Sequence, residues 1–353
     1  MPRTMYITHR LNNYQEFLMV RYILHRLLWM IPVILGVLLI AFFLSSVAPG
    51  RAVDQILGYD APEEDKLALE EELGMNDPFF VRYGRYVAGI VTRGDLGNSY
   101  KTRQPVLGEI LSKFPNTLKL TFFAVLVALI IGIPLGVIAA VKQYSAIDNA
   151  TMVFALFGVS VPQFWFALMM MLIFSVRLKL LPAITTGNGA LGWILPVAMV
   201  GIANVGMIAR TTRSSMLEVI RQDYIRTARA KGQKESAVIF KHALRNSLIP
   251  VAATLGNTIA SSLGGSIIAE SIFSVNGVGL YMLNAINGRD WPAVQGGLAF
   301  LAVVFSVVML FIDLLYTVID PRLKDEFNAK NKMAANRRAA KKKAREAAKA
   351  ANA

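Results

Sequence analysis

Six long apolar runs without a charged residue alternate with polar segments along this chain. The runs are residues 27–50, 120–141, 149–176, 180–209 (a loop plus a span), 246–269 and 291–312. About 20 apolar residues in a helix cross the roughly 30 Å of hydrocarbon in a bilayer. Backbone polar groups must be bonded inside lipid, and no run alternates polar and apolar positions, so we expect helices rather than strands. The pattern predicts an all-α, polytopic membrane protein with six transmembrane helices.

Lys and Arg are unevenly distributed among the connecting segments. Residues 1–26 hold four Lys or Arg and one acid, residues 210–245 hold nine and three, and the segment from Asp320 holds eleven and four. The loop of residues 48–118 holds eight and eleven. Since Lys and Arg mark the cytoplasmic side, both termini are expected in the cytoplasm. The same rule places 142–148 and 210–245 inside, and 48–118, 177–192 and 271–290 outside.

These assignments divide the chain into four parts. They are a cytoplasmic N-terminal extension (1–19), a first transmembrane helix with an extracytoplasmic helical loop (20–118), a five-helix core that includes loop 210–245 (119–319), and a basic cytoplasmic tail (320–353). The net charge of +14 follows from this topology and the tail, so we expect membrane lipid and no nucleic acid as a partner. The tail is a frayed helix, a lipid-binding segment or a solvated one. Met19 is an alternative start to Met1.

The external loop is amphipathic and predicts three short helices. Acids in the first turn after Pro62 predict a helix that ends at Gly74. Residues 82–91 predict a second helix, 94–97 a turn, and 105–114 a third helix ahead of the second span. Such a segment is expected to fold against the outer mouth of a helical bundle.

The chain lacks the residues that common catalytic sites need. There is no Gly-Lys dipeptide, hence no Walker phosphate loop, and no cysteine. His9, His25 and His242 are far apart and all expected in the cytoplasm, which disfavours a zinc site or an intramembrane serine protease. Glu270 and Asp313 lie near span ends, and no paired helix breaks are evident, which disfavours an ion-driven carrier. We therefore expect no catalytic, cofactor-binding or metal site.

The fifth span carries a polar face. Asn257, Ser261 and Gly264-Gly265 are three to four residues apart and share one side of a helix, with Thr258 and Ser262 beside them. Small polar residues serve helix packing or line a water-filled passage. Both uses stay open, and the candidate pathway residues are Asn257, Thr258, Ser261 and Ser262.

The 210–245 loop holds a short helix between two spans. Asp223 is placed to cap its first N–H groups, and Gly232 to end it in the left-handed conformation. Arg226 and Arg229 share one face, with two small residues between them. A positive-inside loop explains the charge but not a bounded helix, so we interpret it as a docking element. The docking candidates are Asp223, Tyr224, Arg226, Thr227, Ala228, Arg229, Lys231 and Gly232.

In this loop the chain resembles the "EAA" coupling loop of permease subunits in binding-protein-dependent ABC importers. It is most similar to the first permease of dipeptide, oligopeptide and nickel importers. Matching stretches run from about Val20 to Arg322. They are Gly94-Asp95-Leu96-Gly97, Pro162-Gln163-Phe164-Trp165, Asp223-Tyr224, Thr227-Ala228-Arg229-Ala230-Lys231-Gly232, His242-Ala243-Leu244-Arg245-Asn246, Glu270-Ser271-Ile272-Phe273, Gly277-Val278-Gly279, Asp290-Trp291-Pro292, Asp313-Leu314-Leu315-Tyr316 and Asp320-Pro321-Arg322.

The resemblance implies a type I importer permease fold and a set of partners. These are a second homologous permease, two cytoplasmic ABC ATPase subunits that hydrolyse ATP, and an extracytoplasmic substrate-binding protein that delivers peptide. The helix at 224–231 would dock on an ATPase and rock the spans between inward- and outward-open forms. The chain departs from the family at Arg226, where Glu often begins the triplet, and at Asn276, where Pro often precedes Gly277.

Two other classes of function remain as alternatives. An ion-coupled secondary carrier of small polar solutes would need an acid at mid-membrane, and a membrane-embedded hydrolase would need a histidine there. The cargo stays open among dipeptides, longer peptides, nickel chelates and sugar oligomers, because an external binding protein does most of the selecting in such importers.

Overall fold

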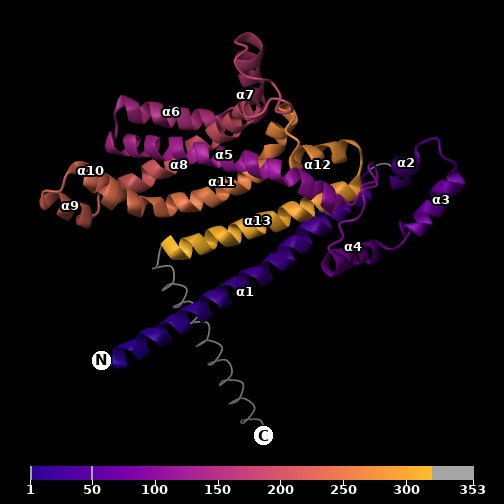
Figure 1. The fold of residues 1–353 in the computed structure, drawn as a ribbon, viewed down its shortest axis with the longest axis horizontal. Helices are drawn as coiled ribbons and strands as arrows, with labels where there is room; N and C mark the ends of the chain where they lie inside the picture. The colour runs from indigo at the N-terminus through magenta and orange to yellow at the C-terminus, as the bar shows by residue number, and fades with distance from the viewer. Residues whose placement is uncertain (1, 49–50, 320–353) are drawn as a thin grey trace, which may run out of the picture.

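The computed structural model describes residues 2–48 and 51–319, and its regular elements in that part of the chain are helices (Figure 1), with one isolated bridge between Asn98 and Pro105. The α-helices are α1 (Pro2–Val47), α2 (Ala52–Leu57), α3 (Glu63–Glu72), α4 (Phe79–Arg93), α5 (Val106–Val141), α6 (Ala146–Ser160), α7 (Gln163–Met170), α8 (Ile194–Ile220), α9 (Asp223–Ala230), α10 (Glu235–Ala237), α11 (Leu244–Ile272), α12 (Val278–Asn287) and α13 (Trp291–Ile319). Two π-helices, η1 (Met171–Arg177) and η3 (Val238–Ala243), and a 3₁₀-helix, η2 (Leu191–Trp193), complete the set.

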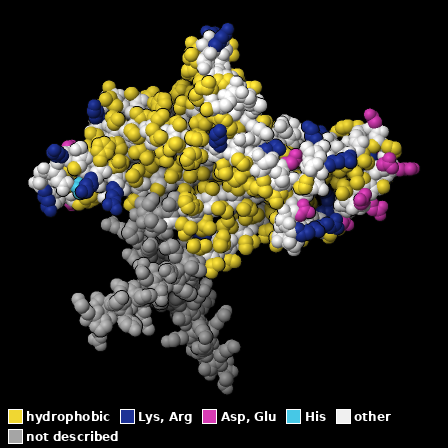
Figure 2. Space-filling view, viewed as in Figure 1, with side chains coloured by type: hydrophobic (Ala, Val, Ile, Leu, Met, Phe, Trp, Pro, Cys, Tyr) yellow, Lys and Arg dark blue, Asp and Glu magenta, His cyan; other side chains and the backbone are white. Residues whose placement is uncertain are grey.

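Within the described ranges, four helices are long and apolar enough to cross a membrane. They are Arg26–Val47, Val106–Val141, Leu191–Ile220 and Trp291–Ile312, and two bent helix pairs raise the number to as many as six. Figure 1 shows α1, α13, α11, α8 and α5 side by side in one bundle. Hydrophobic side chains cover the middle of the molecule, Lys and Arg gather at the α9 end, and acids gather at the α3 end (Figure 2). This distribution is typical of a protein whose middle lies in lipid.

The third predicted span, 149–176, is not one straight helix. Ala146–Gly158 and Gln163–Arg177 meet at an angle of 103°, and Figure 1 shows α7 turning steeply away from α6. Pro162 has no N–H to continue the helix, and its ring forces Val161 into an extended backbone with ψ 129°. The proline seen in the sequence therefore ends a helix here.

The fifth span is also bent. Its two parts, Glu235–Gly264 and Ser266–Ile272, differ in direction by 41°, and the bend falls at Gly264-Gly265. Two successive glycines weaken a helix because glycine loses more backbone conformational entropy than other residues when it becomes helical. Two of the predicted spans are therefore bent at a break, which the sequence did not predict.

Several helices extend past the boundaries expected from the sequence. α5 runs without a break from Val106, so the separate short helix predicted at 105–114 is wrong. One buried face with Ile110, Thr117 and Leu120 continues through Pro115, and packing along that face holds the helix together. α1 likewise includes residues 2–19 as part of one helix. The tail 320–353 and the side chains of His9, His25 and Asp313 lie outside what the structure describes.

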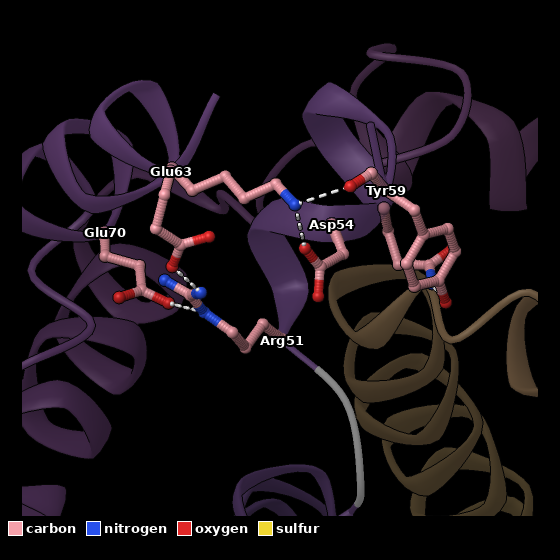
Figure 3. Close-up of polar contacts among 7 residues, drawn as sticks. Arg51, Asp54, Tyr59, Glu63 and Glu70 are labelled. Atoms are coloured by element: carbon pink, nitrogen blue, oxygen red, sulfur yellow. Dashed lines mark hydrogen bonds and ion pairs between the residues drawn. The ribbon is translucent and has the colours of Figure 1, made fainter. Parts of the chain in front are cut away.

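The external loop begins with two helices joined by ion pairs (Figure 3). Arg51 contacts the carboxylates of Glu63 and Glu70, with 2.8 Å between its Nε and Glu70 Oε1. The buried Lys66 ammonium lies 2.9 Å from Asp54 and donates to the Tyr59 carbonyl at 2.8 Å. α3 occupies the predicted position, whereas the six-residue α2 was not expected from the sequence.

The rest of the external loop is attached to the bundle. The expected turn is present, with Gly94 and Gly97 at φ 64° and 83°. The buried Asp290 carboxylate, just before α13, accepts hydrogen bonds from the Ser99 hydroxyl and from the Tyr100 amide at 2.9 Å. This contact joins residues 190 positions apart and fixes the loop against the start of the last span.

Glycines let α5 and α8 approach closely. A Cβ added at Gly136 would lie 2.5 Å from the Ala209 carbonyl oxygen and 2.5 Å from Thr212 Cβ, and one at Gly132 would lie 2.9 Å from Ile208 Cβ. Gly132 and Gly136 therefore serve helix packing, one of the two uses that small residues have in membrane helices.

We expect Gly136→Ala to lower the thermal unfolding midpoint of the detergent-solubilised protein, because the extra methyl group must push α5 and α8 apart at a cost of about 1–3 kcal/mol. Gly108→Ala is the matched control on the same helix, since a Cβ there meets nothing within 4 Å. Its midpoint should stay the same or rise, because alanine favours the helix. Equal midpoints for the two variants would contradict the packing argument.

Candidate functional site

The short helix α9 projects from the end of the molecule where exposed Lys and Arg gather (Figures 1 and 2). It begins at Asp223, and its N-cap is Gln222, whose carbonyl accepts from the Ile225 and Arg226 amides at 3.1 and 3.3 Å. The prediction that Asp223 is the capping residue is therefore wrong. The chain becomes helical one residue earlier, and Asp223 instead lies 3.7 Å from the Arg226 guanidinium.

The C-terminal end of α9 agrees with the sequence. Gly232 has φ 72°, its amide donates to the Arg229 carbonyl at 2.9 Å, and the Gln233 amide donates to the Ala228 carbonyl at 3.4 Å. These two bonds form a Schellman motif, which satisfies carbonyls that the helix leaves free. Gly232 confines α9 to two turns because a left-handed residue there ends the helix.

α9 has one face turned into the protein and one turned to solvent. Ile225 and Ala228 are buried in a cluster that includes Met216 on α8 and Val238 and Ile239 on η3. All the other residues of α9, together with Lys231 and Gly232, are exposed. Ala228 therefore holds α9 in place, while Tyr224, Arg226, Thr227 and Lys231 form the outer surface.

Three polar contacts join α9 and the residues just after it to the start of the fifth span. The Asn246 side-chain amide donates to the Tyr224 hydroxyl at 2.8 Å. His242 Nε2 lies 2.7 Å from Gln233 Oε1. Sequence reasoning placed His242 and Asn246 in a family motif but did not foresee these partners, because they lie 9 and 22 residues away in the sequence.

The third contact is an ion pair. Arg229 donates to the Glu235 carboxylate from Nε at 3.1 Å and from Nη2 at 2.6 Å. This hydrogen bonding raises the pKa of the Arg229 guanidinium further above its usual value, so the residue stays charged. The Arg229 guanidinium thus already has a carboxylate partner in this chain. The Arg226 side chain on the same helix is 74% exposed.

A buried ion pair braces the helices that lead to α9. Arg213 on α8 contacts Asp148 at the start of α6 with two hydrogen bonds, of 2.5 and 2.7 Å. Asp148 is 1% exposed and also accepts from the Tyr144 amide at 3.0 Å. Two parallel bonds from a guanidinium fix orientation as well as distance. Sequence analysis missed this pair because its residues are 65 positions apart.

The structure divides the four candidate pathway residues into two pairs. Asn257 and Ser261 lie on the exposed face of α11, together with Gly264. Thr258 and Ser262 are 4% and 3% exposed and face neighbouring helices. Thr258 donates to the Thr254 carbonyl of its own helix, and Ser262 accepts from Asn204 at 2.9 Å. The exposed pair is available to a passage, and the buried pair packs helices.

A polar seam that sequence reasoning missed runs between α8 and α11. Asn204 on α8 donates to Ser262, and Thr254 donates to Thr211 at 3.3 Å. Asn204 is the one polar side chain between residues 194 and 209 of α8, and this was the only signal of it in the sequence. The seam fixes the relative rotation of α8 and α11, and so determines which side of α11 is exposed.

Glu270, near the C-terminal end of α11, is fully buried. Its carboxylate accepts from the Thr117 hydroxyl at 2.8 Å and from the Leu280 amide at 2.9 Å. A Cβ at Gly277 would lie 2.4 Å from the carboxyl carbon, so glycine is needed there. Glu270 joins α5, α11 and α12 at a span end, and it is not part of the exposed polar face of α11.

Two protein-family models together match most of this chain. Residues 132–325 match the family described as binding-protein-dependent transport system inner membrane component. Residues 19–121 match the N-terminal part of such a membrane component. The first match includes α9 and both helices that hold it.

Individual relatives match along nearly their whole length. The dipeptide transport system permease protein DppB of Alkalihalophilus pseudofirmus is 42% identical, over 87% of this chain and 100% of its own. The oligopeptide transport system permease protein AppB of Bacillus subtilis is 37% identical over 87% and 100%. DppB of Escherichia coli K12 is 37% identical over 87% and 99%.

The fold is similar to that of a solved transporter. A chain of the MetNI methionine ABC transporter in an inward-facing conformation superposes with a TM-score of 0.53 and 18% identity, over 62% of this chain and 99% of that one. This likeness concerns the fold alone. From the matched ranges and the identities together, the chain belongs to the family of binding-protein-dependent transport system inner membrane components.

Proposed function

We propose that this chain is the permease subunit of an ATP-driven ABC importer, and that it moves dipeptides or oligopeptides across the cytoplasmic membrane by alternating access. The observation that carries the proposal is α9, a two-turn helix whose apolar face is packed into its own chain and whose polar face is free. The names of the relatives support peptide as the cargo. In this family ATP hydrolysis belongs to separate subunits.

The proposed assembly brings this chain together with three kinds of partner. A second homologous permease completes the passage, two cytoplasmic ATPases grip the α9 helices, and an external binding protein delivers the peptide. The chain then has six spans in a type I importer fold, with each bent helix pair counted as one span. Both termini and α9 lie in the cytoplasm, in agreement with the Lys and Arg content of those segments.

Force from the ATPases would enter through the exposed side of α9. Tyr224, Arg226, Thr227 and Lys231 form that side, and Asp223 and Gly232 set its two ends. α8 continues to Ile220, and the bent fifth span begins at Glu235, so only short connections separate α9 from two spans. A displacement of α9 would therefore move α8 and α11 together, and with them the exposed Asn257 and Ser261.

Arg226→Glu tests the docking surface. We expect the affinity of the permease for its ATPase subunits to fall roughly tenfold or more, since a reversed charge in an interface costs at least about 1–2 kcal/mol. The measurement is co-purification and titration of ATPase subunits with permease in nanodiscs. Lys142→Glu, an exposed charge reversal in the α5–α6 turn, is the matched control. Unchanged ATPase binding by Arg226→Glu would exclude α9 as the docking element.

The Tyr224–Asn246 hydrogen bond is expected to affect the number of peptides moved per ATP. Tyr224→Phe removes only the hydroxyl group, and Asn246→Ala removes its donor. If the hydroxyl acts through Asn246, each single variant should lower the ratio of transport to ATP hydrolysis, and the double variant should be no worse than the singles. Additive losses in reconstituted complexes would mean that the hydroxyl contacts an ATPase instead.

The alternative is an ion-coupled carrier of small polar solutes, which the two bent spans favour. Against it, the buried Glu270 is fully hydrogen-bonded at a span end. We expect uptake by the reconstituted complex to continue when a proton uncoupler is added at constant ATP, and to stop when ATP is removed. Uptake that persists without ATP and stops with the uncoupler would establish the carrier.

A further inference from the structure

α4 has an apolar face that packs on the bundle and a second apolar face that does not. Its inner side, with Tyr83, Tyr86 and Ile90, packs against the buried cluster around Leu38. The Tyr83 hydroxyl donates to the Leu35 carbonyl at 2.9 Å, in the middle of the first span. α4 therefore lies along the outer half of the first span, where it contacts residues from Leu35 to Phe43.

The outer apolar face follows the helix period. Phe80, Gly84, Ala88 and Val91 recur at intervals of three or four residues, so at about 3.6 residues per turn they lie on one side. Phe80 and Val91 are each 76% exposed. Among the described residues nothing packs over this side, although a soluble helix would carry polar residues there.

The polar residues of α4 occupy a separate sector. Arg82, Arg85, Thr92 and Arg93 lie together between the inner face and the outer apolar face. α4 itself contains no acid, and the Arg85 guanidinium contacts Asp77, which precedes the helix. An amphipathic helix with a basic polar sector and a broad apolar sector is typical of helices that lie in the interface of a bilayer.

The outer face continues the exposed surface of the first span. Phe43 on α1 contacts Phe79 with ring centroids 6.2 Å apart, and Phe79 contacts Phe80 at 5.3 Å. Leu44 and Val47 on α1 are 60% and 65% exposed, in a helix apolar enough to cross a membrane. Lipid that covers α1 in this membrane protein thus meets the outer face of α4 without a polar gap.

We propose that α4 is an interfacial helix, seated in the bilayer beside the outer end of the first span. Its outer apolar face contacts lipid acyl chains, and the exposed Arg85 and Arg93 face the headgroup phosphates, while the Arg82 guanidinium lies over the Phe42 ring, 5.6 Å from its centroid. α4 thereby anchors the external loop, from α2 to the Gly94 turn, at a fixed height above the membrane.

Spin labels in the complete transporter in nanodiscs test this placement. The chain has no cysteine, so Phe80→Cys and Val91→Cys each add its only thiol, with cysteine-free partner subunits. Leu44→Cys on α1 is the lipid-exposed reference and Glu64→Cys on α3 the water-exposed reference. Collision rates with oxygen, which concentrates in lipid, and with a water-soluble nickel chelate are measured at each site.

We expect labels at positions 80 and 91 to show an oxygen-to-nickel collision ratio several-fold above that at position 64 and close to that at position 44. The label at position 91 is an independent check on the label at position 80. Phe80 contacts the Phe79 ring, whereas Val91 lies apart from that ring pair. A ratio like that at position 64 would place α4 in water and overturn the proposal. Protection from both reagents would overturn it too, and would identify a protein subunit as the occupant.

Discussion

The close approach of α5 and α8 is the constraint on which the position of the candidate site depends. Gly132 and Gly136 on α5 leave no room for a side chain against α8, and Gly206 on α8 leaves none against α6, where a Cβ would lie 2.6 Å from the Ala155 carbonyl oxygen. Lipid provides no hydrophobic driving force for helix association. Close van der Waals packing between the helix backbones stabilises these pairs instead. Because α8 leads directly into α9, the orientation of α8 determines where α9 projects.

A second set of contacts makes the end of the molecule around α9 a rigid unit. The buried Asp148 holds Arg213 on α8, and breaking such a pair costs about 3–5 kcal/mol because it leaves an unpaired buried charge. α9 is packed between α8 and η3 through Ile225, and Asn246 ties it to α11. A short helix held on three sides transmits a push, whereas a flexible loop would absorb it. This is the physical basis for interpreting α9 as a point of force entry.

Features that depend on a single stretch of chain were readable from the sequence. The charge-free runs predicted membrane helices because crossing a bilayer requires a minimum apolar length. Gly74 and Gly232 were correctly placed at helix ends because glycine adopts a positive φ without strain. The existence of the α9 helix was predicted for the same reason: its end signal and its position between spans are local. Pro162 is visible in the sequence, but the residues around it do not distinguish a small kink in one helix from the 103° change of direction between two helices.

The tertiary structure alone decided which faces are covered and which residues are partners. Thr258 and Ser262 are buried while Asn257 and Ser261 are exposed, because α8 and α13 cover one side of α11 and leave the other free. The sequence places all four residues close together on one helix, but it does not show which helices pack against that helix. Hydrogen bonds between distant residues, such as that from Asn204, are equally invisible. Period and composition thus determined the elements and the class of protein, and helix packing determined the surface each element presents.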